Sequence, residues 1–474
     1  MMKRKLTGIS LAIMMIISAV AGCGSSSGSQ EDKGEASAPS SQQASVNENE
    51  ETAQAASGQE AAGDRVNLVL WFGLSGQAGE IVQQAIQNYN DSQDKVYVEV
   101  QYQGSYEESL NKLKTAMRTK AGPDLVQIYE AGTRTMIDSG FVIPMQTIID
   151  AYGIDISGLE ENLLNYYVVD GKLYSMPLNT SVPVCYYNKT VLSQIGYEDG
   201  PKSWDDIGDI SQKVIDQGLA ESGIALCSNL AWCFEQPMVQ QRYPMVDNDN
   251  GRAGRATRST LADGTLAVDI AAKFQEFVTK GYTANVGFTV EDNRAAFWSG
   301  NAVIMMDSSG SIRASLEAID GAYELGVCEF PGLTKDAPNG GVTLGGASIY
   351  VCDNGKGDAK NEAIADFMKY LIDPETQGFI FANTGYFPIT SAALEQEAVK
   401  ETMKEYPQYQ VVIDTVHNSP NMGFGALYAS LVDGRAIYVD YLEKMFLGEV
   451  TPKECIERSV QEIDTLIEEY NEIN

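Results

Sequence analysis

The run Val66-Asn-Leu-Val-Leu-Trp-Phe72 is short, mostly apolar and followed by glycine, a pattern that predicts a buried β-strand. Residues 80–90 then place their apolar side chains on one helical face. Apolar and polar side chains alternate over residues 96–102, which predicts a second strand. A capping box that starts at Ser105 predicts the next helix, and residues 124–129 again have a strand pattern. This β-α-β-α-β order is typical of a parallel sheet covered by helices.

The same alternation continues toward the C-terminus. Ser203 and Thr289 each stand where a helix is expected to begin, and residues 302–306 have the composition of a strand. The final helix has a strong start, with Thr451 as N-cap and proline and glutamate at the positions that favour a first turn. Residues 65–474 exceed what one hydrophobic core usually covers, so the sequence predicts an α/β protein with two lobes.

The N-terminus has the features of an export signal. A basic run at residues 3–5 precedes an apolar run at residues 9–20, which is too short for a comfortable membrane span. Ala21 and Gly22 then precede Cys23, which resembles the bacterial lipoprotein signal, in which the cysteine is acylated and anchors the protein to the outer face of the cell membrane. An ordinary signal peptide with an incidental cysteine is the alternative. We therefore expect a signal peptide over residues 1–22.

A tether is expected next. Residues 23–64 consist mainly of Ser, Gly, Glu, Gln and Ala and contain no aromatic residue, so they cannot bury enough surface to fold. The sequence therefore predicts a lipidated cysteine followed by a disordered linker.

Charge narrows the possible partners. The formal net charge is −32, and residues 65–474 alone carry 29 Lys and Arg against 57 Asp and Glu. Such a field repels nucleic acid and anionic lipid. An anionic ligand would therefore need local positive potential supplied by its own site.

Cysteine and histidine limit the chemistry. Six cysteines follow Cys23 without a C-x-x-C motif; Cys227 and Cys233 are the one close pair, and buried free thiols are the favoured interpretation over disulfides. His417 is the single histidine, which removes most zinc sites and any histidine-based nucleophilic triad. We expect no metal and no cofactor.

Several blocks, in order along the chain, resemble one family. The blocks are Tyr102-Gln-Gly-Ser-Tyr-Glu-Glu-Ser-Leu110, Gln127-Ile-Tyr-Glu-Ala-Gly-Thr133, Met176-Pro-Leu-Asn-Thr-Ser-Val-Pro-Val-Cys-Tyr-Tyr-Asn-Lys189, Asp307-Ser-Ser-Gly-Ser311, Lys335-Asp-Ala-Pro338, Gly345-Gly-Ala-Ser348 and Thr384-Gly-Tyr-Phe-Pro-Ile-Thr390. With these blocks the chain is similar to the solute-binding proteins of ABC importers that include maltose-binding protein, and most of all to their glycerol-3-phosphate-binding members.

The resemblance implies a type II periplasmic-binding-protein fold, in which two α/β lobes joined by a hinge enclose a ligand cleft. It places residues 65–178 with 308–370 in lobe 1 and residues 179–307 with 371–474 in lobe 2, so that the chain crosses near 178, 307 and 371. It also implies a monomer that is not an enzyme and that delivers its ligand to the membrane subunits of an ABC permease.

Carried over residue by residue, the resemblance places eight side chains or backbone groups at the ligand: Tyr106, Glu130, Ser181, Trp204, Ser308, Gly346, Tyr386 and Arg435. One position departs from the family pattern, because Phe72 follows Trp71 where the family often has histidine.

The residue types suit a small phosphorylated polyol. Arg435 offers a charged fork for phosphate, and hydroxyls together with the N–H of Gly346 add neutral donors. Glu130, which accepts only, is expected at the opposite wall, where it would hold glycerol hydroxyls, with Tyr106 covering the carbon skeleton. The sequence thus predicts binding of glycerol 3-phosphate or a glycerophosphodiester.

Two other functions fit parts of the pattern. A neutral sugar or oligosaccharide would use aromatic platforms, which Trp71, Trp204, Trp232 or Trp298 could supply. An exported hydrolase would use paired carboxylates, but no segment resembles a hydrolase motif. Taken singly, each proposed site residue has an ordinary structural role; Arg435, for instance, could pair with Asp433 or Glu443 on a helix surface.

Overall fold

The computed structural model describes residues 65–119, 121–226, 230–287, 289–338, 340–355, 357–419 and 425–473. The predicted signal peptide, the lipidation site Cys23 and the linker to residue 64 lie outside the described residues.

The first sheet contains the strands that the N-terminal pattern predicts. Its order is β2 (Val96–Tyr102), β1 (Val66–Phe72), β3 (Leu125–Tyr129), β12 (Gly345–Cys352) and β4 (Val142–Ile143), and β7 (Met176–Ser181) also pairs with β12. Strand β1 is parallel to β2 and β3, whereas β12 is antiparallel to β3. Helices α1 (Gly76–Ser92) and α2 (Tyr106–Arg118) connect the parallel strands. The predicted β-α-β-α-β order is confirmed.

Local signals explain these boundaries. The inward side chains of β1, Leu68, Leu70 and Phe72, are fully buried, as the apolar pattern requires. The Ser105 hydroxyl accepts a hydrogen bond from the backbone N–H of Glu108, whose carboxylate accepts one from the N–H of Ser105. Such a cap stabilises a helix start by about 1 kcal/mol, and here it aims the next residue, Tyr106, at the cleft described below.

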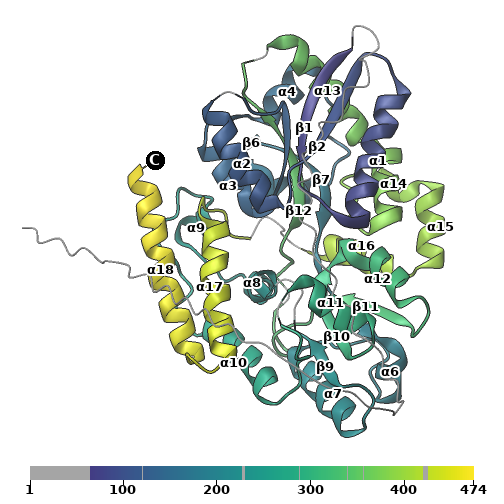
Figure 1. The fold of residues 1–474 in the computed structure, drawn as a ribbon, viewed down its shortest axis with the longest axis vertical. Coiled ribbons are helices and arrows are strands. Elements are labelled where there is room, and N and C mark those ends of the chain that lie inside the picture. The colour runs from purple at the N-terminus through teal and green to yellow at the C-terminus, as the bar shows by residue number, and fades with distance from the viewer. Residues whose placement is uncertain are drawn as a thin grey trace, which may run out of the picture. The chain divides into compact units, whose positions relative to one another are not determined.

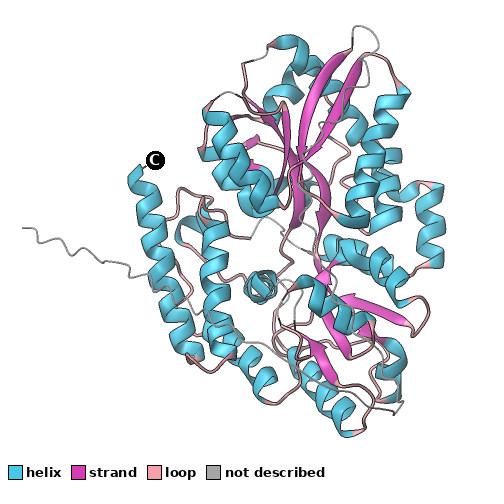
Figure 2. Ribbon diagram, viewed as in Figure 1, coloured by secondary structure: helices cyan, strands magenta, loops and turns pink. Residues whose placement is uncertain are grey.

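The second sheet has the order β11 (Leu325–Glu329), β8 (Pro183–Asn188), β10 (Ala302–Ser308) and β9 (Ser222–Ala225). Strand β8 is antiparallel to both of its neighbours. Helix α7 (Trp204–Asp216) packs against β9 and begins after Ser203, as predicted, with a capping box formed by Ser203 and Asp206. Helices cover the faces of both sheets (Figures 1 and 2).

The connections between the two sheets differ from the expectation. The chain leaves the first sheet at residue 182, after β7, and returns between β11 and β12. The predicted crossing near 307 is therefore wrong, and the assignment of all of 308–370 to lobe 1 is wrong for β11, because β11 pairs with β8 of the second sheet. Nor does residue 371 mark a crossing, since α14 (Pro374–Thr384) packs against α1 of the first lobe. Strand pairing is a long-range property that segment patterns do not specify.

A layer of helices follows the second sheet. Helix α17 (Leu431–Phe446) packs on α18 (Pro452–Ile473) and also contacts α8 (Leu230–Gln240) and α10 (Leu266–Thr279). Thr451 caps α18 as predicted, because its hydroxyl accepts a hydrogen bond from the N–H of Glu454. Figure 1 shows α17 and α18 side by side, in yellow, with α8 seen end-on beside α17.

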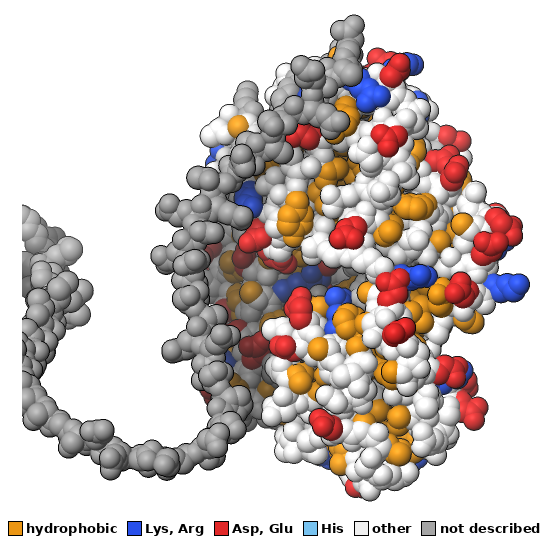
Figure 3. Space-filling view, turned by 45° about the vertical axis from the view of Figure 1, so that its right-hand side comes forward, with side chains coloured by type: hydrophobic (Ala, Val, Ile, Leu, Met, Phe, Trp, Pro, Cys, Tyr) orange, Lys and Arg blue, Asp and Glu red, His pale blue; other side chains and the backbone are white. Residues whose placement is uncertain are grey.

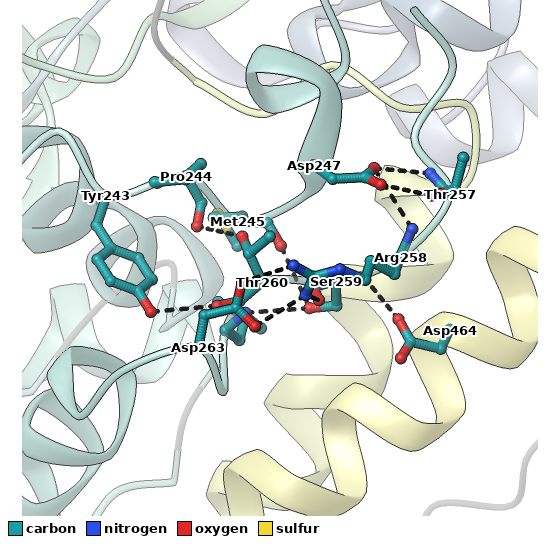
Figure 4. A network of polar contacts seen from close by, with 11 residues as sticks. Tyr243, Pro244, Met245, Asp247, Thr257, Arg258, Ser259, Thr260, Asp263 and Asp464 are labelled. Carbon is teal, nitrogen blue, oxygen red and sulfur yellow. Dashed lines mark hydrogen bonds and ion pairs between the residues drawn. The ribbon is translucent and has the colours of Figure 1, made fainter.

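Hydrogen bonds fix the loop before α10 against helix α18. The Asp247 carboxylate accepts hydrogen bonds from the N–H and hydroxyl of Thr257, and the N–H of Ser259 donates to Asp464 on α18 at 2.5 Å (Figure 4). The segment between α9 (Asp247–Gly251) and α10 is thereby fixed against α18.

The remaining helices and strands are short or lie on the periphery: α3 (Thr133–Asp138), α4 (Met145–Tyr152), α5 (Glu161–Leu164), α6 (Lys189–Gln194), α9 (Asp247–Gly251), α11 (Val290–Trp298), α12 (Ile312–Ile319), α13 (Asp358–Leu371), α15 (Glu397–Glu405), α16 (Gln408–Asn418), β5 (Val168–Val169) and β6 (Lys172–Leu173), with 3-10 turns at Glu130–Gly132, Asn165–Tyr167, Ser309–Ser311 and Ser391–Glu395. None of the helices within the described ranges is long and apolar enough to cross a membrane.

The cysteines follow the expectation in part. Cys185, Cys328, Cys352 and Cys455 are free thiols, as favoured by the sequence. Cys233 is disulfide-bonded, which corrects the interpretation of this residue as a free thiol; its partner lies outside the described residues.

Candidate ligand-binding cleft

A cleft of about 460 Å³ is lined by residues of both lobes. Seven of the eight predicted positions lie along its wall: Tyr106, Glu130, Ser181, Ser308, Gly346, Tyr386 and Arg435. They come from widely separated segments, since Ser181 ends β7, Ser308 ends β10 and Arg435 lies on α17. Figure 3 shows acidic side chains spread over the visible face of the molecule, with Lys and Arg side chains among them.

Trp204 does not line the cleft. Its side chain is fully buried, and its ring centroid lies 5.1 Å from that of Phe274 and 5.7 Å from that of Phe277. The Ser203 capping box sets the start of α7, and this buries the first-turn tryptophan in the core between helices. The expectation that Trp204 contacts the ligand is therefore wrong, and Trp232 of α8 is the tryptophan that lines the cleft.

Arg435 is shared between two carboxylates. Its Nε and Nη2 donate to the two oxygens of Glu235, at 2.7 and 2.8 Å, and its Nη1 donates to Glu130 at 2.7 Å. The Tyr438 hydroxyl donates a further short hydrogen bond to Glu235. All three charged side chains are largely removed from solvent, with Arg435 14% exposed.

This arrangement differs from the predicted one. The predicted site has the guanidinium and Glu130 at opposite walls, but in the structure the two form a direct ion pair, and Glu235 occupies the Nε/Nη2 edge of the guanidinium. The cluster of one cation and two carboxylates carries a net charge of −1 when all three are ionised. The local positive potential expected for an anion site is therefore cancelled within the cluster.

Burial and charge set the protonation of the cluster. Burial raises the pKa of Glu130 above its ordinary value; Arg435 opposes the rise and Glu235 adds to it. Burial alone would lower the pKa of Arg435, but the two carboxylates raise it well above the ordinary value, so the guanidinium stays charged.

Sequence reasoning missed Glu235. It lies within the run Leu230-Ala-Trp-Cys-Phe-Glu-Gln-Pro-Met-Val239, all of which is buried. Glutamate is almost never fully buried unless it is paired, so a single carboxylate inside an apolar helix was a signal that a cationic partner lies nearby.

Another part of the wall presents neutral donors. The Ser308 hydroxyl accepts from the N–H of Gly310, which leaves its own proton free to donate. Gly346 has a φ of +88°, and a Cβ there would lie 1.8 Å from the carbonyl oxygen of Asn179, so no other residue fits without a shift of the backbone. With Ser181 and Tyr386, these groups offer hydrogen-bond donors without adding charge.

Aromatic rings complete the wall. Tyr106 and Tyr129 stack with their centroids 5.4 Å apart and their planes 7° from parallel. The Trp232 indole lies so close to Gly345 that a Cβ there would come within 2.4 Å of it. Glu107 also lines the cleft, so these rings share it with a further carboxylate.

The sequence is similar to those of known proteins over most of its length. Residues 84–410 match the model of a family described as bacterial extracellular solute-binding protein. Two similar curated proteins are the sn-glycerol-3-phosphate-binding periplasmic proteins UgpB of Yersinia pseudotuberculosis, 27% identical over 426 residues (86% of this chain and 93% of the relative), and of Shigella flexneri, 28% identical over 416 residues (85% and 93%).

Solved structures share the fold. UgpB from Mycobacterium tuberculosis in complex with glycerophosphocholine has a TM-score of 0.72 and 19% identity, with 86% of this chain and 99% of that chain covered. The GacH receptor of Streptomyces glaucescens, solved with acarbose, has a TM-score of 0.71 and 18% identity, with 85% and 98% covered. At these identities the likeness concerns the fold alone.

Proposed function

Because the chain belongs to the bacterial extracellular solute-binding proteins, which deliver small ligands to ABC importers, we propose that its cleft binds a glycerophosphodiester in preference to glycerol 3-phosphate. The observation that carries this proposal is the pairing of Arg435 with both Glu130 and Glu235. The names of the UgpB relatives and the glycerophosphocholine complex of a protein with the same fold support the ligand class.

The charge balance favours a diester. Two unit charges about 8 Å apart repel by roughly 2 kcal/mol at an effective dielectric constant of about 20. Free glycerol 3-phosphate carries close to two negative charges at neutral pH, whereas a phosphodiester carries one. When both carboxylates are ionised, the cluster that they form with Arg435 is net negative and therefore opposes the monoester more strongly. A zwitterionic diester such as glycerophosphocholine, with no net charge, is opposed least.

Neutral donors suit the phosphoryl group. Its oxygens only accept hydrogen bonds, and Ser181, Ser308 and Tyr386 offer hydroxyls that donate. Hydrogen bonds to a charged acceptor contribute about 1.5–3 kcal/mol each. We place the phosphoryl group among these donors rather than on the guanidinium.

We place the glycerol hydroxyls at the charged cluster of Arg435, Glu130 and Glu235. Arg435 has five N–H groups, and three are donated to Glu130 and Glu235. The other two can donate to hydroxyl oxygens, while the Glu130 carboxylate accepts from hydroxyl protons. This assigns Glu130 the role that the sequence predicted, but beside Arg435 instead of across from it.

A calorimetric panel tests the proposal. We expect the purified protein to bind glycerophosphocholine more tightly than glycerol 3-phosphate by at least tenfold, with glycerophosphocholine recovered unhydrolysed. Equal or tighter binding of glycerol 3-phosphate would contradict the charge argument. Hydrolysis of the diester would instead favour the exported hydrolase.

A neutral oligosaccharide is the second candidate. The aromatic side chains Trp232, Tyr106 and Tyr129 together with a charge-compensated guanidinium favour it, because sugar sites combine ring faces with polar groups. Binding of maltotriose in the same panel, without binding of either phosphoester, would establish this alternative.

We further propose that the protein acts as a monomer tethered through a lipid on Cys23, which brings the cleft close to the permease subunits. Light scattering of the soluble body, residues 65–474, checks the oligomeric state, for which we expect a mass of one chain.

A further inference from the structure

Two buried amide side chains stand behind the cleft without lining it. Gln127 on β3 and Asn179 on β7 are both fully buried. An amide transferred from water to an apolar interior without hydrogen bonds costs several kcal/mol, so the contacts that satisfy this pair are informative.

Those contacts are hydrogen bonds in series, and each has a defined donor and acceptor. The backbone N–H of Gly73 donates to Oε1 of Gln127 at 3.0 Å. The Gln127 nitrogen then donates to Oδ1 of Asn179 at 2.9 Å, and the Asn179 nitrogen donates to the Tyr106 hydroxyl oxygen at 3.1 Å. Because a backbone N–H can only donate, the first bond sets which end of Gln127 accepts, and each later bond follows from it.

This series of hydrogen bonds ends at Tyr106, a residue that lines the cleft. Since the Tyr106 oxygen accepts from Asn179, its own proton cannot be directed back at the amide nitrogen, which has no lone pair to offer. No protein acceptor for this proton is found among the residues that the structure describes. The ring itself is held in place by its stack on Tyr129 and by Gly73, where a Cβ would lie 3.0 Å from the Tyr106 ring.

Asn179 reaches a second phenol of the cleft. Burial raises the pKa of Tyr386, and a hydrogen bond with the Asn179 amide opposes that rise. The absence of a Cβ at Gly346 permits β12 to approach the backbone carbonyl of Asn179 closely, which fixes the main chain of β7 at this residue.

We propose that Gln127 and Asn179 are positioning residues that fix the Tyr106 hydroxyl as a donor into the cleft. The ligand must then present an oxygen that accepts at this point, as phosphoryl and ether oxygens do. The statement about Tyr106 holds for any ligand of the cleft; its application to a phosphoryl oxygen rests on the proposed phosphodiester function.

A double-mutant cycle measured by calorimetry with glycerophosphocholine tests the inference. Tyr106→Phe removes the donor and is expected to weaken binding roughly 10- to 100-fold, as for a lost hydrogen bond to a charged acceptor. Asn179→Leu frees the hydroxyl to rotate and should weaken binding roughly tenfold in the wild type but less than threefold in the Tyr106→Phe background. Thr180→Val is the matched control: this buried β7 hydroxyl makes no hydrogen bond within the described structure, and its removal should leave the affinity unchanged.

Additive losses in the cycle would overturn the inference, because Asn179 would then act independently of the Tyr106 hydroxyl. If Asn179→Leu does not fold, Gln127→Met takes its place, and the same dependence on the Tyr106 hydroxyl is expected. Failure of the wild type to bind glycerophosphocholine counts against the phosphodiester proposal alone, and the cycle is then decided with maltotriose.

Discussion

At the scale of single residues, the decisive feature is one guanidinium shared by two carboxylates. Glu130 and Glu235 come within 2.7 Å of Arg435 from segments 305 and 200 positions away in the chain. Neither carboxylate could be buried so deeply without this cation. Arg435 therefore has a structural task in addition to the role proposed for it in binding.

Replacement of Arg435 by alanine should destabilise the protein as well as weaken binding. Two buried carboxylates would lose the cation to which both are paired, a change that typically costs about 3–5 kcal/mol. Urea unfolding of Arg435→Ala measures the loss. Arg458→Ala, a half-exposed arginine on α18, is the control and should change the unfolding free energy by less than about 1 kcal/mol. An Arg435→Ala variant as stable as the wild type would contradict the described ion pairs.

Replacement of Glu235 by glutamine tests the charge balance. The amide keeps the shape of the side chain but removes one negative charge from the cluster. We expect the affinity ratio of glycerol 3-phosphate to glycerophosphocholine to rise roughly tenfold, because the dianion gains more from the lost repulsion. Calorimetry with both ligands measures this ratio, and an unchanged ratio would show that the cluster does not discriminate by charge.

At the scale of secondary-structure elements, Asp124 joins three parts of the first lobe. Its carboxylate, buried just before β3, accepts from the N–H of Val69 at 2.9 Å, from Lys360 at 2.7 Å and from Asn354 at 2.9 Å. Burial opposes its charge, but these hydrogen bonds outweigh burial and lower the pKa of Asp124. The Asp124 carboxylate thus links strand β1, strand β3 and helix α13.

The contribution of Asp124 to stability should depend on pH. Because its pKa is lowered in the folded state, the stabilisation is complete above the unfolded value of about 4 and is lost as the pH falls through the folded value. We expect Asp124→Asn to cost roughly 1–3 kcal/mol of unfolding free energy at pH 7 and progressively less below pH 4. Urea unfolding at pH 7, 5 and 3.5 measures the difference, with the exposed Asp94→Asn as control; a difference that does not change with pH would refute this assignment.

At the scale of the whole molecule, the cleft exists because the chain passes between two sheets. Tyr106, Glu130 and Gly346 come from the first lobe, whereas Trp232 and Arg435 come from helices packed with the second. A ligand that contacts both sides stabilises the closed arrangement of the lobes. This is the arrangement that we propose the importer recognises.

The proposed tether can be tested in cells of the source organism. Cys23→Ala should move the protein from the membrane fraction to the medium or another soluble extracytoplasmic fraction, because the acyl chains are its only proposed anchor. Immunoblots of both fractions measure the change, and Cys455→Ala, which alters a buried thiol of α18, serves as control. Persistence of Cys23→Ala in the membrane fraction would count against lipidation.

The amino-acid sequence by itself determined the local elements. Strands at 66–72 and 96–102 and helix starts at Ser105, Ser203 and Thr451 depend on side chains only a few residues apart, so each signal is complete within its own segment. Family resemblance added the positions that line the cleft. Only the tertiary structure decided which of these groups meet. Three features join segments distant in sequence: the pairing of β11 with β8, the burial of Trp204 and the ion pair of Arg435 with Glu235. The packing and electrostatic interactions between such segments leave no pattern within either segment, so the sequence alone does not predict them.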